Sequence, residues 1–131
     1  MRKIKFRGKR IDCDKIIYGD AFCTRANSVF ISHIERMEKV YSETLGQFTG
    51  MYDIDGNEIY EDDILQNISF PEVYLQVAWH HGCWIVKSAD FDPEGNEYEI
   101  LYETLRDFKM LVVGNIHENP ELLKGATTNE S

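Results

Sequence analysis

The 131-residue sequence lacks the long apolar run that a membrane-spanning helix requires. No stretch approaches the roughly 18 consecutive apolar residues needed to cross a bilayer. The start of the chain leads into a polar segment and not into a signal-peptide core. We therefore expect a cytoplasmic protein. Hydrophobic residues make up 43% and charged residues 28%, which is ordinary for a folded chain of one domain or two small modules.

Cysteine is scarce, and nucleotide-binding motifs are missing. Cys13, Cys23 and Cys83 form an odd set without a close pair, which argues against a disulfide framework and favours reduced thiols. Neither a Gly-x-Gly-x-x-Gly nor a Walker sequence occurs. The sequence therefore disfavours a nucleotide-driven enzyme.

Basic residues are fewer than acidic ones, 14 against 23, and the formal net charge is −9. All of the acidic residues lie beyond position 10, whereas six basic residues fall within the first ten, so this segment carries +6 and the remainder −15. A body with that much negative charge repels polyanions. Strong non-specific DNA binding would require the basic segment to be presented separately.

The first ten residues have the alternation of a half-buried strand. Ile4 and Phe6 point to one side of an extended chain. The basic residues on the other side are Lys3, Lys5 and Arg7. A turn follows, and residues 16–22 are predicted to pair back on the first strand. The basic side could contact phosphate, but a solvated or carboxylate-neutralised strand face is the more ordinary interpretation.

Short segments with strand character continue along the chain. Residues 29–31 can form a strand, and residues 33–40 can form a loop or one helical turn. Asp55-Gly56 predicts a hairpin, because a type I′ turn requires positive φ at both central positions. Further downstream, the expected elements are strands at 63–66, 73–79, 84–86 and 110–113, the last of them buried, a turn at 92–96 and a short helix at 99–107.

This pattern favours a mostly β protein, because many short strands leave little room for crossover helices. We expect an antiparallel β-roll or small barrel with one or two short helices. The expected organisation is an N-terminal hairpin segment over residues 1–43, a β-roll over 44–124 and a frayed polar tail over 125–131.

Three blocks of sequence carry a resemblance to a known family. They are Lys5–Lys9 with Tyr18–Asp20, Gly46–Gly50 continuing through Asp55-Gly56 to Ile59–Ile64, and Val113–Leu123. In this order they resemble the YopX-like family of phage and prophage proteins over nearly the whole chain. The resemblance implies phage or prophage origin in a bacterial host, an SH3-like β-roll and a homo-oligomer. The family has no assigned activity, so it supplies no catalytic residues.

One position departs from the family pattern. Asp62 stands where the family usually has glycine. If that glycine serves a positive φ, aspartate is a tolerable replacement, because it enters the left-handed region more readily than most residues.

Two acidic segments resemble calcium loops without completing one. The segment starting at Asp53 has Glu58 where an EF-hand loop needs glycine and Ile64 where it needs glutamate. The segment starting at Asp90 has Leu101 in place of the final carboxylate. Turn chemistry is therefore the favoured interpretation, and we expect no cofactor.

The segment around residue 80 combines aromatic residues with possible metal ligands. His80, His81 and Cys83 could bind zinc, but a structural site needs four ligands, and a fourth would have to come from a partner subunit. Trp79 and Trp84 flank the same expected hairpin. Exposed, they could bind a partner; we expect at least one to be buried. The candidate binding surface consists of Lys3, Lys5, Arg7, Trp79, His80, His81 and Trp84.

Three functions are compatible with these features. The leading hypothesis is a non-enzymatic accessory protein that acts by self-assembly and by binding a phage or host protein, because the oppositely charged segments supply complementary surfaces. The alternative is a nucleic-acid-binding module that uses the basic strand with Tyr18 or Phe22. A second alternative is an unrecognised enzyme with a pocket that gathers Cys83, histidines and carboxylates.

Overall fold

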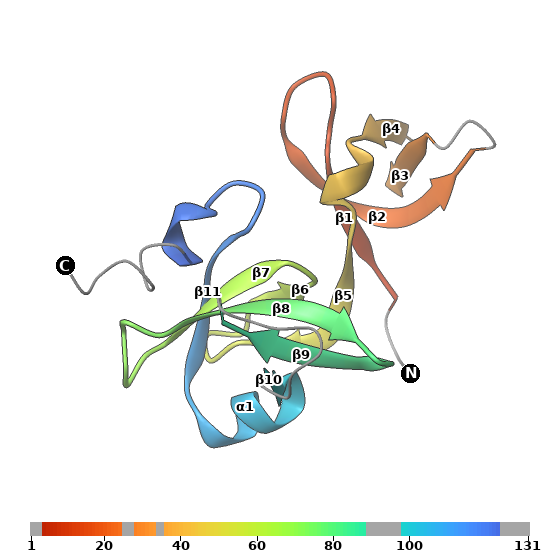
Figure 1. Cartoon of the computed structure of the whole chain (residues 1–131). Helices are drawn as coiled ribbons and strands as arrows, with labels where there is room; N and C mark the ends of the chain where they lie inside the picture. Colours follow the sequence, from red (N-terminus) through yellow and green to blue (C-terminus); the bar gives the residue numbers. More distant parts are fainter. Residues whose placement is uncertain (1–3, 25–27, 34–35, 89–97, 124–131) are drawn as a thin grey trace. The chain divides into compact units, whose positions relative to one another are not determined.

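Antiparallel strands dominate both parts of the molecule (Figure 1). The chain divides into an N-terminal unit, Met1–Gly50, and a C-terminal unit, Met51–Ser131. The prediction of a mostly β, antiparallel protein is confirmed. The computed structural model describes residues 4–24, 28–33, 36–88 and 98–123.

The strands of the N-terminal unit belong to one six-stranded sheet with the order β4-β3-β2-β1-β5-β6. In this sheet β5 continues past Gly50 into the C-terminal unit, and β6 belongs to the C-terminal unit. The predicted hairpin between the first two strands is confirmed by their antiparallel register. The elements of this unit are β1 (Phe6–Lys9), β2 (Ile16–Cys23), β3 (Val29–His33), β4 (Arg36–Val40), the 3-10 turn η1 (Ser42–Thr44) and β5 (Gly46–Tyr52).

The prediction of a loop or helical turn over residues 33–40 is wrong, because β4 is a strand. It pairs with β3 in an antiparallel register that sets Val40 opposite Val29. Val40 is buried, whereas Met37 and Lys39 are exposed. Exposure along the strand thus alternates with the period of two that a β-strand shows. A single buried apolar residue among charged neighbours nevertheless gives a weak sequence signal for a strand.

The end of β4 returns to the end of β1. Val40 forms a β-bridge with Arg10, and the Tyr41 N–H donates to the Lys9 carbonyl at 2.8 Å. Val40 also lies over Gly8, where an added Cβ would come within 2.9 Å of a Val40 methyl carbon. Glycine at this position therefore permits the close approach. The buried core of the unit consists of Val29, Ile31 and Val40, with Phe6, Ile17 and Leu45 packed against them.

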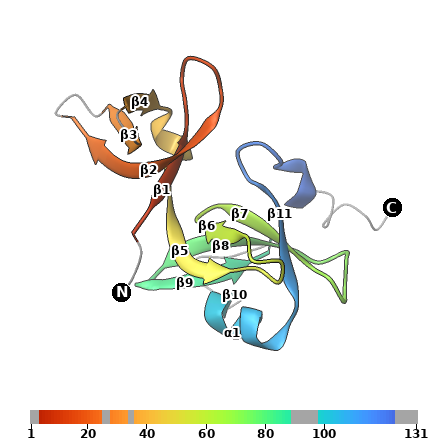
Figure 2. The same cartoon turned by 180° about the vertical axis from the view of Figure 1, so that it is seen from behind.

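The C-terminal unit contains a second sheet with the strand order β10-β9-β8-β7-β11. All neighbouring strands in this sheet are antiparallel. Figure 2 shows α1 beside β10 from behind. The elements of the unit are β6 (Glu58–Tyr60), β7 (Asp63–Asn67), β8 (Tyr74–His80), β9 (Cys83–Lys87), β10 (Tyr98–Ile100), α1 (Leu101–Asp107) and β11 (Met110–Asn115).

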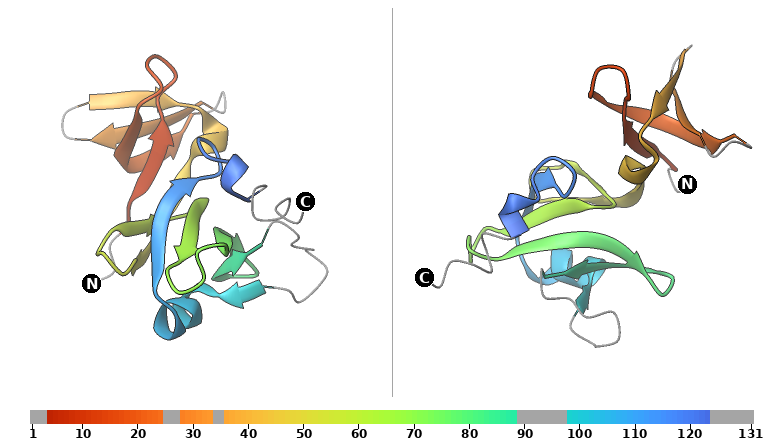
Figure 3. Two further views of the ribbon diagram at one scale, coloured as in Figure 1. Left: turned by 90° about the vertical axis from the view of Figure 1, so that its left-hand side faces the viewer. Right: turned by 45° about the horizontal axis from the view of Figure 1, so that its top comes forward.

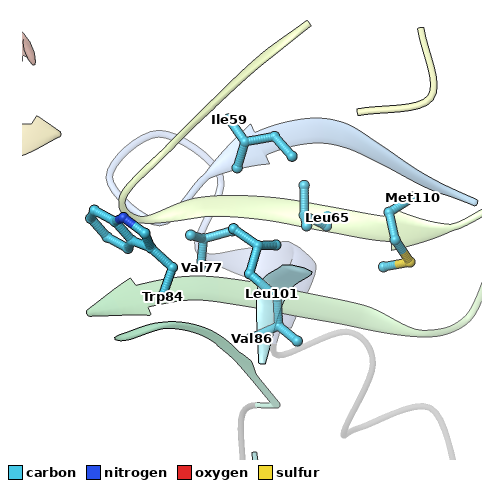
Figure 4. Close-up of a cluster of buried hydrophobic side chains, with 7 residues drawn as sticks. All are labelled: Ile59, Leu65, Val77, Trp84, Val86, Leu101 and Met110. Atoms are coloured by element: carbon cyan, nitrogen blue, oxygen red, sulfur yellow. The ribbon is translucent and has the colours of Figure 1, made fainter. Parts of the chain in front are cut away.

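An apolar cluster forms the core of the described part of the C-terminal unit. Figure 4 shows Trp84 at one end of this cluster and Met110 at the other. Leu101, the first residue of α1, is fully buried and ties the helix to the sheet. The cluster consists of Ile59, Leu65, Val77, Trp84, Val86, Leu101 and Met110.

The short helix predicted at 99–107 is confirmed, although β10 occupies its first two residues. The strand predicted at 110–113 is also confirmed, but its expected burial is wrong for most of its length. Met110 is buried, whereas the next three residues are half-buried, because β11 is an edge strand with β7 as its sheet neighbour.

The two predicted β-turn regions differ in their backbone geometry. Between β5 and β6, Gly56 has a φ of 86°, but Asp55 does not have a positive φ. The Gly56 N–H donates to the Asp53 carbonyl at 3.0 Å, which indicates a type I turn followed by a left-handed glycine and not the expected type I′ turn. Positive φ at two successive residues occurs instead between β8 and β9, at His81 (50°) and Gly82 (80°).

In the described residues, neither sheet forms the closed barrel that was one of the two expected forms. The SH3-like topology stays a prediction. The described residues contain no helix that is long and apolar enough to span a membrane. The turn predicted at 92–96 and the tail predicted at 125–131 lie outside the described residues.

Candidate binding surface

Four of the predicted binding residues lie at the end of the β8–β9 hairpin. The right panel of Figure 3 shows the ribbon of this hairpin in green. Trp79 lies directly opposite Trp84, and His80 opposite Cys83. The two-residue turn at His81-Gly82 fixes this register. We call Trp79, His80, His81, Trp84 and Tyr98 the hairpin-end surface.

The two tryptophans differ in exposure although they are in contact. Their ring centroids lie 4.9 Å apart with an interplanar angle of 71°, an edge-to-face geometry that aromatic pairs favour. Trp84 is 8% exposed and belongs to the core, whereas Trp79 is 53% exposed. The prediction that at least one tryptophan is buried is confirmed. The buried Trp84 ring therefore supports the exposed indole of Trp79.

The histidine next to Trp79 is close to two other rings. The centroid of the His80 ring lies 3.9 Å from that of His81 and 5.0 Å from that of Tyr98. Desolvation lowers the pKa of His80, and the nearby His81 and Lys87 lower it further. His80 is therefore uncharged near neutral pH. Among the described residues, no three His, Cys, Asp or Glu side chains converge as a metal ion requires.

The basic residues of the candidate set belong to the N-terminal unit and do not share one solvated face. Lys3 lies outside the described residues. The Lys5 Nζ lies 5.8 Å from the centroid of the Tyr18 ring, a cation–π geometry. Arg7 is 8% exposed, so its predicted place on an open basic face is corrected. The physical reason is that β1 has sheet neighbours on both sides, and Arg7 pairs with Tyr18 and Gly46.

Sequence reasoning missed Tyr98 as a member of the hairpin-end surface. Tyr98 begins β10, a three-residue strand that pairs with β9 and places Tyr98 opposite Lys87. Its neighbour in the sequence, Glu99, was assigned to a helix. A tyrosine before that helix gave no signal that it would meet a histidine from another strand.

The comparison with protein families covers both units. The family model described as YopX protein matches residues 5–124. The chain belongs to the YopX family. The crystal structure of protein EF1440 from Enterococcus faecalis is similar, with a TM-score of 0.59, 23% sequence identity, and coverage of 94% of this chain and 99% of that chain. This likeness concerns the fold alone. No curated protein matches the chain.

Two of the sequence blocks that resemble the YopX family contain turns held by polar side chains. Asp63 is 1% exposed, and its Oδ2 accepts the Tyr60 N–H at 2.7 Å. After β11, the Asn115 Oδ1 accepts the N–H groups of His117 and Glu118, each at 3.0 Å. These polar side chains satisfy backbone donors at sites where the chain reverses.

The position that departs from the YopX pattern does require a left-handed backbone. Asp62 has a φ of 72°, so the prediction that aspartate replaces glycine at a positive φ is confirmed. The side chain adds contacts that glycine cannot make. Its Oδ2 lies 3.2 Å from the His117 Nε2, and its Oδ1 accepts a hydrogen bond from the Gln76 side chain at 3.3 Å.

We expect Asp62→Gly to be tolerated better than Asp62→Ala. Both variants lose the contacts to His117 and Gln76, but alanine also meets the strain of the left-handed region, which costs about 1 kcal/mol more. Urea denaturation of the two variants measures this difference. A lower stability for the glycine variant would show that backbone strain at residue 62 is not the dominant effect.

Proposed function

We propose that this YopX-family protein is a non-enzymatic accessory protein of phage or prophage origin that acts in the bacterial cytoplasm by self-association and by binding another protein. The observation that carries the proposal is the exposure of Trp79, whose ring contacts the buried Trp84 on the opposite strand of the same hairpin. An SH3-like roll, the finer form of the fold that we propose, is suited to presenting aromatic side chains near loop ends.

An indole held in this way is well suited to protein recognition. Tryptophan is enriched among the residues that contribute most to binding energy at protein interfaces. The edge contact with Trp84 and the short turn limit the motion of Trp79 before a partner arrives. Less side-chain entropy is then lost on binding, so more of the contact energy appears as affinity.

The use of polar residues in turns supports a role without catalysis. Asp53, Asp63 and Asn115 are buried and direct their oxygens at backbone N–H groups of their own unit. The N-terminal unit has a groove of about 530 Å³. Its ionisable lining residues are Lys39, Tyr41 and Glu43, a set without the cysteine or histidine that a nucleophilic mechanism commonly uses.

The nucleic-acid alternative receives less support. Arg7 is buried, and the Arg10 Nη2 lies 2.7 Å from Asp12 and 3.3 Å from Glu38. Both guanidinium groups are therefore poorly placed to contact phosphate. Lys5 beside Tyr18 is the feature that still favours this alternative, because a cation near an aromatic ring suits single-stranded nucleic acid.

The proposal is tested with tagged full-length protein expressed in infected or lysogenic cells. We expect sedimentation analysis to give a mass above that of one chain, and we expect affinity capture to retain a protein that Trp79→Leu loses. Phe70→Leu is the matched control, because Phe70 is 52% exposed and lies in the turn at the other end of β8. A monomer that retains no partner, or a captured nucleic acid that Lys5→Gln releases, would overturn the proposal.

A further inference from the structure

We infer that the hairpin-end surface binds a cationic segment of a partner protein, with Lys or Arg side chains approaching the face of Trp79. This inference rests on the proposed protein-binding function and specifies the chemistry of the partner. It is carried by two independent observations: the exposure of Trp79 and the distribution of charge between the two units.

The C-terminal unit is strongly acidic. Residues 51–131 include 17 acidic and four basic residues, a formal net charge of −13, whereas residues 1–50 carry a net charge of +4. One of those four basic residues, Arg106, already pairs with Asp107 at 2.9 Å. The field of such a unit attracts cationic partners, repels acidic ones and speeds the encounter with the former.

Lys87 is a cation close to His80 and reduces the negative field at the hairpin end, but the unit as a whole stays strongly acidic. His80 is uncharged near neutral pH, because desolvation, His81 and Lys87 hold its pKa below the usual value. The Asp62 N–H donates to the Val77 carbonyl at 2.8 Å, which places an acidic turn beside β8 two residues before Trp79. A partner cation at the indole would therefore approach a unit of net negative charge with an acidic turn beside β8.

The geometry of the tryptophan pair suits a cation. Tryptophan is the strongest cation–π acceptor among the aromatic side chains. The contact with Trp84 has an interplanar angle of 71°, so the two rings are not stacked face to face. Trp79 stays 53% exposed, which leaves indole surface for a guanidinium or ammonium group.

A different protein is favoured over a second copy as the source of the cations. The most basic segment of this chain is its first ten residues. Within it, Arg7 is buried and Arg10 is paired with two carboxylates. These two guanidinium groups are therefore not available to the hairpin-end surface of a second copy, and the partner that we infer is a Lys- or Arg-bearing segment of another protein.

The test measures binding of short labelled peptides to the full-length protein by fluorescence anisotropy. The probes are a peptide of four Gly-Arg repeats and a peptide of four Gly-Glu repeats. We expect the arginine peptide to bind and the glutamate peptide not to bind. Binding should weaken between about 50 mM and about 500 mM salt, because salt screens surface charge. Trp79→Leu should weaken binding about fivefold, the loss expected for an exposed cation–π contact.

Matched variants separate the cation–π contact from general attraction. Trp79→Phe should retain part of the affinity, and Phe70→Leu, which removes an aromatic ring of similar exposure elsewhere in the unit, should leave affinity unchanged. Equal affinity of the wild type and Trp79→Leu, or absence of arginine-peptide binding at low salt, would overturn the inference. The protein could capture a partner from cells through Trp79 and yet not bind the arginine peptide. That result would refute the cationic chemistry inferred for the partner, but not the proposed protein-binding function.

Discussion

Replacing Asp53 with alanine is expected to lower the free energy of unfolding by about 3–5 kcal/mol, because buried backbone donors would lose a charged acceptor. Asp53 is 7% exposed. Its Oδ1 accepts the N–H groups of Asp55 at 2.9 Å and Asn57 at 2.8 Å. Its Oδ2 accepts the Asn57 side-chain amide at 3.0 Å and the Val112 N–H at 2.9 Å.

The bond to Val112 gives this carboxylate a role beyond its own turn. Val112 lies on the edge strand β11, 59 residues further along the chain. The Ile54 N–H also donates to the Met110 carbonyl of β11 at 3.0 Å. The turn after β5 therefore covers part of an edge that would otherwise expose unpaired backbone groups. Removing Asp53 should loosen the turn and the strand together.

Urea denaturation followed by tryptophan fluorescence, to which buried Trp84 contributes, measures this effect. Asp55→Ala is the matched control, since Asp55 is exposed in the same turn, and it should change stability by less than about 0.5 kcal/mol. Asp53→Asn should lose much of the stability too, because its amide turns one acceptor oxygen into a donor that faces other donors. A stability of Asp53→Ala equal to that of the control variant would contradict this account.

The same carboxylate makes stability depend on pH in a defined direction. Desolvation would raise the pKa of Asp53, but the hydrogen bonds from Val112, Asn57 and Asp55 outweigh it and hold the pKa below its usual value. A folded pKa below the unfolded value, about 3.9, means that the carboxylate stabilises the fold fully above that pH. The contribution is lost as the pH falls through the folded pKa. The difference in stability between wild type and Asp53→Asn should therefore narrow in acid.

Local patterns were sufficient to predict most of the hairpins. The alternation in residues 16–22 and 73–79 identified strands that the structure confirms as β2 and β8. The turn after β5 was located correctly but assigned the wrong type. The Asp-Gly pair suggested two positive φ values, whereas the bonds from Asp53 to Asp55 and Asn57 favour the turn that is observed.

Features that depend on distant partners were harder to predict. The alternation in the first ten residues predicted the wrong buried side, because Ile4 is 61% exposed and Arg7 is buried. It could not show that β1 would become an interior strand. The pairing of Trp79 with Trp84 followed from a short hairpin and was within reach of the sequence. The approach of Tyr98 to His80 depends on pairing between β9 and β10, which no local pattern announced.

Replacing Gly8 with alanine is expected to cost about 2 kcal/mol, because the new methyl group would overpack the core of the N-terminal unit. An added Cβ would lie 2.9 Å, 3.0 Å and 3.1 Å from the Cγ2, Cβ and Cγ1 atoms of Val40. Val40 is 2% exposed, and its branched side chain has few alternative rotamers. The Val40 side chain therefore cannot rotate away from the new methyl group. The β-bridge between Val40 and Arg10 also holds the Val40 backbone next to the end of β1.

A double-mutant cycle with Val40→Ala tests this explanation. Val40→Ala alone should cost about 2 kcal/mol, because it leaves a cavity. The same change removes the methyl groups that obstruct a side chain at position 8, so the double variant should be more stable than the sum of the two losses predicts by about 1 kcal/mol or more. Additive losses in urea denaturation would mean that contact with Val40 is not what requires glycine at this position.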